Sequence, residues 1–151
     1  MTEEEGKKLL LKDLSARLPY GVKCVSGVDD ATLIIEGINP NCNGASEVQV
    51  TYERSGINFD TKISSIKPYL FPLSSMTEEQ EKEISERYNY HNYFGLCIEI
   101  TNHSEGYWDN DISCNLQDYL WLEDWYNKNH FDYRGLIPLG LAIDATDKNI
   151  Y

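Results

Sequence analysis

Apolar residues recur with helical spacing near the start of the chain. Three leucines stand at four-residue intervals, at Leu10, Leu14 and Leu18. This spacing is typical of one face of an amphipathic helix. Thr2 and Glu5 match a capping box, in which each side chain satisfies a free backbone donor at the helix start. Because Pro19 cannot continue a helix, the pattern predicts a first helix that ends near residue 18.

A strict alternation of apolar and polar residues follows. Val48, Val50 and Tyr52 fall on one side of the segment 47–53, and polar residues fall on the other. This period of two is typical of a half-buried strand. Three further apolar segments have strand character, at 22–25, 31–37 and 57–63. We expect them to form an antiparallel meander, with turns at Asn43-Gly44 and Ser55-Gly56.

Prolines change the pattern after residue 66. Pro68 and Pro72 cannot donate hydrogen bonds to a central ladder. Residues 66–75 are therefore expected to form an extended connector or an edge strand. Ser75 and Glu78 then match a second capping box, ahead of a helix with few apolar residues.

The remaining elements complete the predicted fold. Residues 94–100 alternate as a strand does, and residues 115–129 have the length and spacing of a helix. The chain has 151 residues without an internal repeat or a long linker, so a single domain over 1–151 is expected. We predict an α+β domain, with an antiparallel sheet of about four or five strands and about three helices packed on one of its faces.

The predicted helix at 115–129 carries apolar residues on two sides. One side gathers Leu116, Tyr119, Leu120 and Tyr126. Trp121 and Trp125 fall on the opposite side, so something else must cover them. Two interpretations stay open. The chain's own tail at 136–143 packs over the tryptophans, or they form a binding hot spot for a partner protein or for a second copy in a homodimer.

Charge narrows the class of partner. The chain carries 25 acidic and 13 basic residues, a formal net charge of −12. Such a surface repels phosphate backbones, so we expect no direct nucleic-acid binding, whereas a basic protein partner suits it. No apolar run approaches the ~20 residues of a membrane span, and the acidic start does not resemble a signal peptide. We therefore expect a cytoplasmic protein without membrane contact.

Metal-binding patterns are weak. None of the four cysteines forms a CxxC pair, so we expect reduced thiols and no zinc site. Asp109, Asp111 and Ser113 resemble the start of a calcium loop, but Cys114 replaces the turn glycine and Leu120 replaces the bidentate glutamate. We therefore expect no metal and no cofactor.

Tyrosines crowd residues 88–95. With Trp108 or Arg134, Tyr90 and Tyr93 could line a pocket for a small ligand. Stacking of nucleobases normally comes with a basic groove, and no lysine or arginine lies between residues 88 and 95. The alternative is half-buried packing.

An imidazole, a carboxylate and a guanidinium alternate in the stretch "HFDYRGLI", as His130, Asp132 and Arg134. A hydrolase could use His130 as a base with Asp132 beside it. In the alternative interpretation, each of the three residues has a structural role. His130 would be an imidazolium at the negative end of the preceding helix, Asp132 would cap the next turn, and Arg134 would pair with a carboxylate. We favour this interpretation and keep recognition as a second role for Arg134.

Three stretches resemble signatures of one protein group: "KDLSARLPYGVKC", "IKPYLFPLSSMTEEQ" and "WYNKNHFDYRGLIPLGLAID", about a third of the chain. They are similar to uncharacterised small acidic proteins of gut Bacteroidales and their phages and prophages. The resemblance brings no catalytic residues and implies a cytosolic accessory protein of phage or mobile-element type. Such proteins often block host factors, so we expect a non-enzymatic protein-binding module. A small-ligand or nucleotide binder and a hydrolase using His130 and Asp132 are the alternatives.

Overall fold

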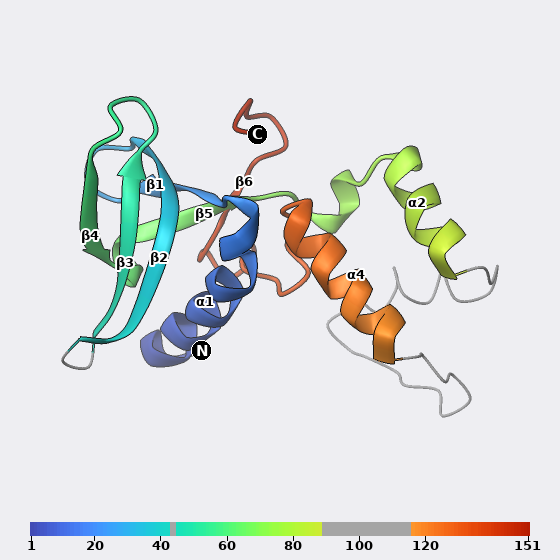
Figure 1. Ribbon diagram of the computed structural model, residues 1–151, viewed down its shortest axis with the longest axis horizontal. Helices are drawn as coiled ribbons and strands as arrows, with labels where there is room; N and C mark the ends of the chain where they lie inside the picture. The colour runs from blue at the N-terminus through green and yellow to red at the C-terminus, as the bar shows by residue number, and fades with distance from the viewer. Residues whose placement is uncertain (43–44, 89–115) are drawn as a thin grey trace.

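A six-stranded, mostly antiparallel sheet and three helices make up the described part of the chain (Figure 1). The computed structural model describes residues 1–42, 45–88 and 116–151. Its helices are α1 (Glu3–Arg17), α2 (Glu78–Tyr88) and α4 (Leu116–Lys128). Its strands are β1 (Lys23–Ser26), β2 (Thr32–Cys42), β3 (Ala45–Tyr52), β4 (Asn58–Lys62), β5 (Ile66–Leu70) and β6 (Ile143–Asp144). The predicted α+β class is confirmed; the predicted strand at 94–100 and the turn at 43–44 lie outside the described residues.

Helix α1 begins and ends where the sequence predicts. Thr2 N–H donates to Glu5 Oε2 at 2.6 Å, and Glu5 N–H donates to Thr2 Oγ1 at 3.2 Å, which confirms the capping box. The helix gives way to a short 3₁₀ turn, Leu18–Tyr20, that contains Pro19. Gly21 then takes a left-handed φ of 67°, so the chain can turn into β1 at little steric cost.

The strands lie in the order β4-β3-β2-β1-β5-β6. Neighbours pair antiparallel from β4 to β5, and β6 joins β5 in parallel. The first four strands form the predicted meander. Two further strands extend the meander: β5 pairs with β1, and the apolar tail adds the two-residue β6, where Ile143 lies opposite Tyr69.

Residues 66–70 form an interior strand, and their prediction as a connector or edge is wrong. Gly27 N–H donates to Ser65 O at 2.8 Å. This bond sets the register, so that Pro68 falls in a non-hydrogen-bonded pair with β1. On the other side of β5, pairing with β6 begins only at Tyr69. The missing N–H of Pro68 therefore costs the ladder no hydrogen bond, which is why a proline is tolerated here.

The turn between β3 and β4 contains a glycine bulge. Gly56 has a φ of 68°, and its N–H donates to Tyr52 O at 2.8 Å. Tyr52 N–H donates in turn to Ile57 O at 3.0 Å. These two bonds define a G1 bulge, in which glycine supplies the positive φ. The predicted Ser55-Gly56 turn is confirmed, and the two bonds fix the register of β4 on β3.

Two hydrophobic clusters stabilise the described residues. The first lies between α1 and the sheet and includes Leu14, Val48 and Val50, each 0% exposed. In the second, α4 packs with Ile84 of α2 and with the 3₁₀ turn Leu73–Ser75. Figure 1 shows α4 and α2 beyond α1, on the side away from β4. Of the described helices, α1 alone contributes to the cluster on the sheet, and α2 and α4 form a separate layer beside it.

Helix α2 is capped two residues later than predicted. Thr77 N–H donates to Gln80 Oε1 at 2.9 Å, and Gln80 N–H donates to Thr77 Oγ1 at 3.3 Å. The Ser75 hydroxyl donates instead to Pro72 O at 2.7 Å. Both Ser-x-x-Glu and Thr-x-x-Gln occur in this stretch, and either matches the capping-box pattern. Because Ser75 belongs to the 3₁₀ turn, Thr77 caps α2 in its place.

Candidate functional site

Helix α4 ends inside the stretch "HFDYRGLI" with a Schellman motif. Phe131 N–H donates to Tyr126 O at 2.9 Å, and His130 N–H donates to Asn127 O at 3.2 Å. His130 takes a left-handed φ of 58°, which glycine more commonly occupies at this position. Phe71 N–H then donates to His130 O at 2.9 Å. His130 therefore ends the helix and joins it to the segment after β5.

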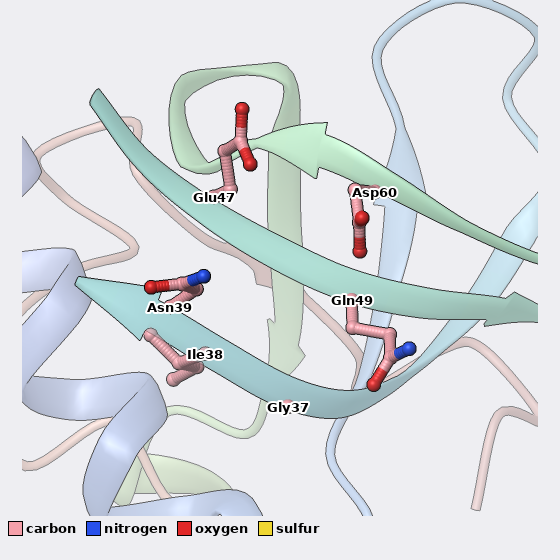
Figure 2. Close-up of a pocket in the computed structure, with 6 residues that line it drawn as sticks. All are labelled: Gly37, Ile38, Asn39, Glu47, Gln49 and Asp60. Atoms are coloured by element: carbon pink, nitrogen blue, oxygen red, sulfur yellow. The ribbon is translucent and has the colours of Figure 1, made fainter. Parts of the chain in front are cut away.

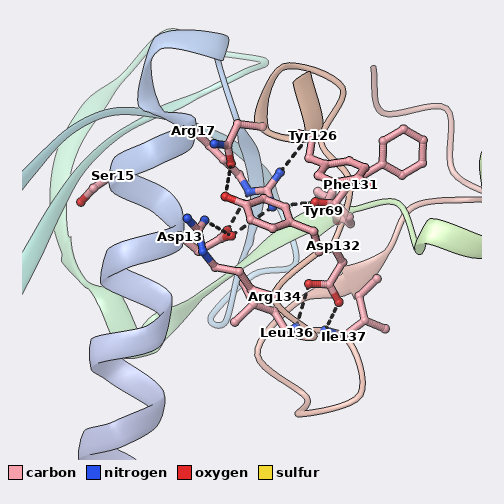
Figure 3. Close-up of polar contacts among 12 residues, drawn as sticks. Asp13, Ser15, Arg17, Tyr69, Tyr126, Phe131, Asp132, Arg134, Leu136 and Ile137 are labelled. Carbon is pink, nitrogen blue, oxygen red and sulfur yellow. Dashed lines mark hydrogen bonds and ion pairs between the residues drawn. The ribbon is translucent and has the colours of Figure 1, made fainter. Parts of the chain in front are cut away.

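Asp132 caps the turn that follows. Leu136 N–H donates to its Oδ1 and Ile137 N–H donates to its Oδ2, each at 2.7 Å (Figure 3). The predicted capping role is confirmed. Burial raises the pKa of Asp132, and the two N–H donors act in the opposite direction. Both carboxylate oxygens therefore serve the backbone of the next turn.

Asp13 of α1 is shared by two arginines. Arg17, one turn along α1, places Nε 2.7 Å from Asp13 Oδ2 and Nη2 3.0 Å from Oδ1. Arg134 places Nη1 3.0 Å from the same Oδ1. Asp13 and Arg17 are both 0% exposed. The prediction that Arg134 pairs with a carboxylate is confirmed, and the burial means that these charges depend on one another.

The same arginines reach α4. Arg17 Nη2 donates to Phe131 O at 2.7 Å, and its Nη1 donates to Tyr126 O at 3.4 Å (Figure 3). Arg134 Nη2 donates to Glu123 Oε1 at 2.6 Å. The network joins α1, α4 and the segment that follows α4. We call it the charge junction and define it by four residues, Asp13, Arg17, Glu123 and Arg134.

Tyr133 forms an aromatic wall of the charge junction. The guanidinium of Arg134 lies 4.4 Å from its ring centroid, and that of Arg17 lies 5.5 Å away. Its hydroxyl is within hydrogen-bond distance of Glu123 Oε1 at 3.1 Å and Asn127 Oδ1 at 3.0 Å. Burial raises the pKa of Tyr133, so the phenol stays protonated. These are cation–π and hydrogen-bond contacts that support the junction.

His130 is a buried, neutral imidazole. It is 8% exposed, its ring stacks on Tyr151 with 3.9 Å between centroids, and its Nδ1 has no hydrogen-bond partner among the described residues. Burial, together with the charges of Arg17 and Lys23, lowers the pKa of His130 from 6.5 to about 4. The prediction of an imidazolium at the helix end is therefore wrong, because desolvation outweighs the attraction of the helix dipole.

The tryptophans of α4 face the second cluster. Trp125 is 4% exposed and stacks on Phe131 with 5.6 Å between centroids. Trp121 is half-buried against the same cluster, and the guanidinium of Arg87 lies 5.5 Å from its ring centroid. Of the two interpretations for the tryptophans, cover by the tail at 136–143 does not hold, because that tail packs in the first cluster. Trp125 is thus a core residue.

The other side of α4 faces solvent. Tyr119 is 50% exposed and Leu120 is 53% exposed, although the helical spacing grouped them with Tyr126, which is buried. Leu122, at 7%, is buried in their place, beside Tyr126 at 2%. The pattern alone could not rank these positions, because α4 has apolar residues on both sides. The exposed apolar surface of α4 therefore centres on Tyr119 and Leu120.

Several predicted features lie outside the described residues. These are Tyr90, Tyr93 and Trp108 of the expected ligand pocket, together with the loop at 109–114. Arg134, the fourth residue of that pocket, belongs to the charge junction. In residues 1–42, 45–88 and 116–151, no group of three or more His, Cys, Asp or Glu side chains could hold a metal ion. Over the same ranges, every helix is too short or too polar to cross a membrane.

Two hollows open on the described surface. One, of about 430 Å³, lies on the sheet face that points away from the core and is lined by Gly37, Ile38, Asn39, Glu47, Gln49 and Asp60 (Figure 2). Its lining is polar and includes two carboxylates. The other, of about 340 Å³, lies beside the start of α1. Apolar side chains such as Leu10, Ile66 and Leu141 line it together with polar ones such as Glu3 and Lys7.

The sequence pattern gave no role to Asp13, Arg17 or Glu123. A signal for the first two was present, because Asp13 and Arg17 interleave with Leu10 and Leu14 at helical spacing. A charged pair four residues apart inside an apolar stripe indicates a buried ion pair. Glu123 has no comparable signal, since it lies among the other acidic residues of α4.

In the charge junction two carboxylates form ion pairs with two guanidinium groups, and each group is hydrogen-bonded within the fold. The arrangement holds elements together and leaves its charged groups engaged with one another. Known proteins supply no further assignment. No protein-family model, no curated protein and no solved structure matches this chain.

Proposed function

We propose that this chain is a non-enzymatic protein-binding module that uses the outward face of α4. One observation carries the proposal. Tyr119 and Leu120 are each about half exposed, while Leu122 and Trp125 on the other side of the helix are buried. Exposed tyrosine and leucine residues at adjacent positions of one helix provide apolar contacts of the kind that protein partners cover.

The contacts of His130, Asp132 and Arg134 also support a non-enzymatic role. Within the described part of the chain, His130 Nδ1 lacks the hydrogen-bond partner that orients a general base. Asp132 accepts two backbone N–H groups, and Arg134 is held by Asp13 and Glu123. The hydrolase alternative would need these side chains to leave the contacts that stabilise the fold.

The kind of partner is proposed from charge and from the family resemblance. A net charge of −12 favours a basic protein surface. The resemblance to proteins of Bacteroidales phages and prophages favours a host factor in the cytoplasm, which the bound protein would inhibit. A second copy of the chain is the other protein that could cover α4, and the experiment below separates the two.

A small-ligand function remains the second candidate because of the hollow beside α1. Its walls include Leu10, Ile66 and Leu141, and Lys7 and Lys67 also line it. Glu3 lines the hollow too and pairs with Lys7 at 2.7 Å, so the hollow suits a small, largely apolar ligand with a polar end. Mass spectrometry of the gently denatured protein tests this role. A stoichiometric small molecule would support it, and none would count against it.

The protein-binding proposal is tested by affinity capture from a Bacteroides lysate at low and moderate salt. The bait is compared with a Leu120→Asp variant and with Leu139→Asp, a control at another exposed leucine that is 45% exposed. We expect one protein to be enriched by the parent and by Leu139→Asp, and to be lost with Leu120→Asp. Equal capture by all three baits, or no enriched protein at either salt concentration, would contradict the proposal. Size-exclusion chromatography with light scattering identifies a second copy as the partner if Leu120→Asp converts a dimer to a monomer.

A further inference from the structure

Strand β4 lies at an edge of the sheet (Figure 1). Within the described residues, β3 is the one strand that pairs with it. The bond from Tyr52 N–H to Ile57 O fixes the ladder. Hydrogen-bonded pairs recur at every second residue of an antiparallel ladder, so Phe59 and Thr61 direct their backbone groups to β3. Asn58, Asp60 and Lys62 therefore direct theirs to the open side, as a template for another strand.

The core-facing side of this edge is apolar and incompletely covered. Phe59 is half-buried, and its ring lies 4.9 Å from that of Tyr52, measured between centroids. Ile57, two residues earlier, is 62% exposed. Apolar side chains on an added strand would cover both residues. The edge therefore favours a strand with apolar residues on the side that faces the core.

The opposite side of the edge is polar and leads to the acidic hollow of Figure 2. Asp60 lies opposite Gln49 of β3, and Glu47 lines the same hollow. Because neighbouring strands lie about 4.8 Å apart, a residue of an added strand opposite Asp60 would bring its side chain to the rim of this hollow. A lysine or arginine there would meet two carboxylates and the Gln49 amide, which gives charge complementarity.

We propose that the open edge of β4 binds an extended segment of a partner protein in which apolar residues alternate with lysine or arginine. This proposal goes beyond the α4 surface, because the recognition mode is addition of a strand to a sheet. A second copy of this chain is a poor occupant. Antiparallel self-pairing centred on β4 would place Asp60 opposite Asp60, and like charges opposite one another destabilise a pair.

The test uses a fluorescent heptapeptide of alternating valine and lysine, with binding measured by fluorescence anisotropy at low and moderate salt. Two peptides serve as controls: alternating valine and glutamate, and a block of lysines followed by a block of valines. We expect the alternating lysine peptide to bind at least about tenfold more tightly than either control. Equal affinity for the block peptide would overturn the proposal, because it would indicate charge attraction without strand pairing.

A pair of variants at Lys62 separates strand addition from electrostatics. Lys62 has a φ of −72°, which suits proline, so Lys62→Pro removes an outward N–H with little strain. Lys62→Gln removes the same positive charge and keeps the N–H. Loss of a positive charge alone should strengthen binding of a lysine peptide. We expect Lys62→Pro to weaken binding about tenfold and Lys62→Gln to retain or strengthen it.

Equal binding by the two Lys62 variants would overturn the proposal. Circular dichroism checks that both variants are folded, and Asp60→Asn provides an independent test, because it should weaken binding of the lysine peptide while keeping the edge N–H. A dimer that dissociates with Lys62→Pro would instead identify a second copy as the occupant and would also overturn the proposal. Leu120→Asp should leave peptide binding unchanged, so failure at β4 and failure at α4 are distinguishable.

Discussion

The carboxylate of Asp13 lies 3.0 Å from the guanidinium of Arg134, although 121 positions separate the two residues in the chain. The Asp13 side chain is 0% exposed and that of Arg134 is 10% exposed. Because the same carboxylate also holds Arg17, one buried charge ties α1 to the segment after α4. The stretch "HFDYRGLI" therefore joins the two hydrophobic clusters.

Removal of Arg17 should destabilise the protein strongly. Arg17→Met leaves the buried Asp13 with a weakened set of partners, and breaking a buried pair costs about 3–5 kcal/mol of unfolding free energy. Urea unfolding followed by circular dichroism measures the loss. The matched control is Lys7→Met, which breaks a 2.7 Å pair with the exposed Glu3 and should cost less than about 1 kcal/mol. Similar losses of unfolding free energy for the two variants would contradict a large contribution of the charge junction to stability.

Stability should fall in mild acid because of His130. Burial holds its folded-state pKa at about 4, below the unfolded value of 6.5. As the pH falls, the unfolded chain binds the proton first. The contribution of His130 is therefore complete above pH 6.5, declines as the pH falls to about 4, and changes no further below that. These two pKa values correspond to a loss of about 3 kcal/mol.

The matched variant for this effect is His130→Asn, because asparagine tolerates the left-handed backbone at this position. Asp132 acts in the opposite direction. Burial raises its pKa above 3.8, so its contribution is lost as the pH rises through the raised value. Both proteins retain Asp132, so the difference between their urea midpoints isolates His130. We expect the variant to lose less stability than the parent between pH 6.5 and 4; parallel curves would contradict the pKa shift.

Local patterns predicted the local parts of the fold well. The capping box at Thr2, the glycine turn at Gly56 and the cap at Asp132 each depend on residues that are close in sequence, and the structure confirms them. Pro68 was misjudged because its tolerance depends on where β6 begins to pair, which is a relationship between distant segments. The protonation state of His130 was misjudged for a similar reason, since the burial that decides it comes from the whole fold.

The candidate site was predicted only in part. Arg134 was expected to pair with some carboxylate, but the chain offers 25 acidic residues. Arg134 pairs with Asp13 and Glu123 because α1 and α4 both pack beside the segment that carries Arg134. The exposed face of α4 was likewise ambiguous, because both of its sides carry apolar residues and only packing against Ile84 and Phe131 decides between them.

Cys24 should be unreactive in the folded protein. Its side chain is 0% exposed, and burial raises the pKa of its thiol to about 12. Thiol reagents act on the accessible thiolate. Iodoacetamide labelling followed by peptide mass spectrometry should leave Cys24 unmodified at pH 8 under native conditions and should label it fully in guanidinium chloride. Rapid labelling of Cys24 in the native protein would contradict its place in the core.

Trp125 should contribute to stability, in contrast to the exposed residues of α4. Trp125→Ala removes a ring that stacks on Phe131, and truncation of a buried aromatic costs about 3–5 kcal/mol. Tyr119→Ala lies on the exposed side and should change the unfolding free energy by less than about 0.5 kcal/mol. Thermal and urea unfolding of the two variants measure the contrast. Equal effects would mean that the two faces of α4 are assigned wrongly.

The most direct measurement of the structural role of "HFDYRGLI" is the coupling free energy between Asp13 and Arg134. A double-mutant cycle of Asp13→Asn, Arg134→Gln and the double variant, followed by urea unfolding, isolates their interaction from other effects of each substitution. A hydrogen-bonded pair in this buried setting should give a favourable coupling of about 1–3 kcal/mol. A coupling within about 0.3 kcal/mol of zero would contradict the account, because Arg134 would then be free to act elsewhere.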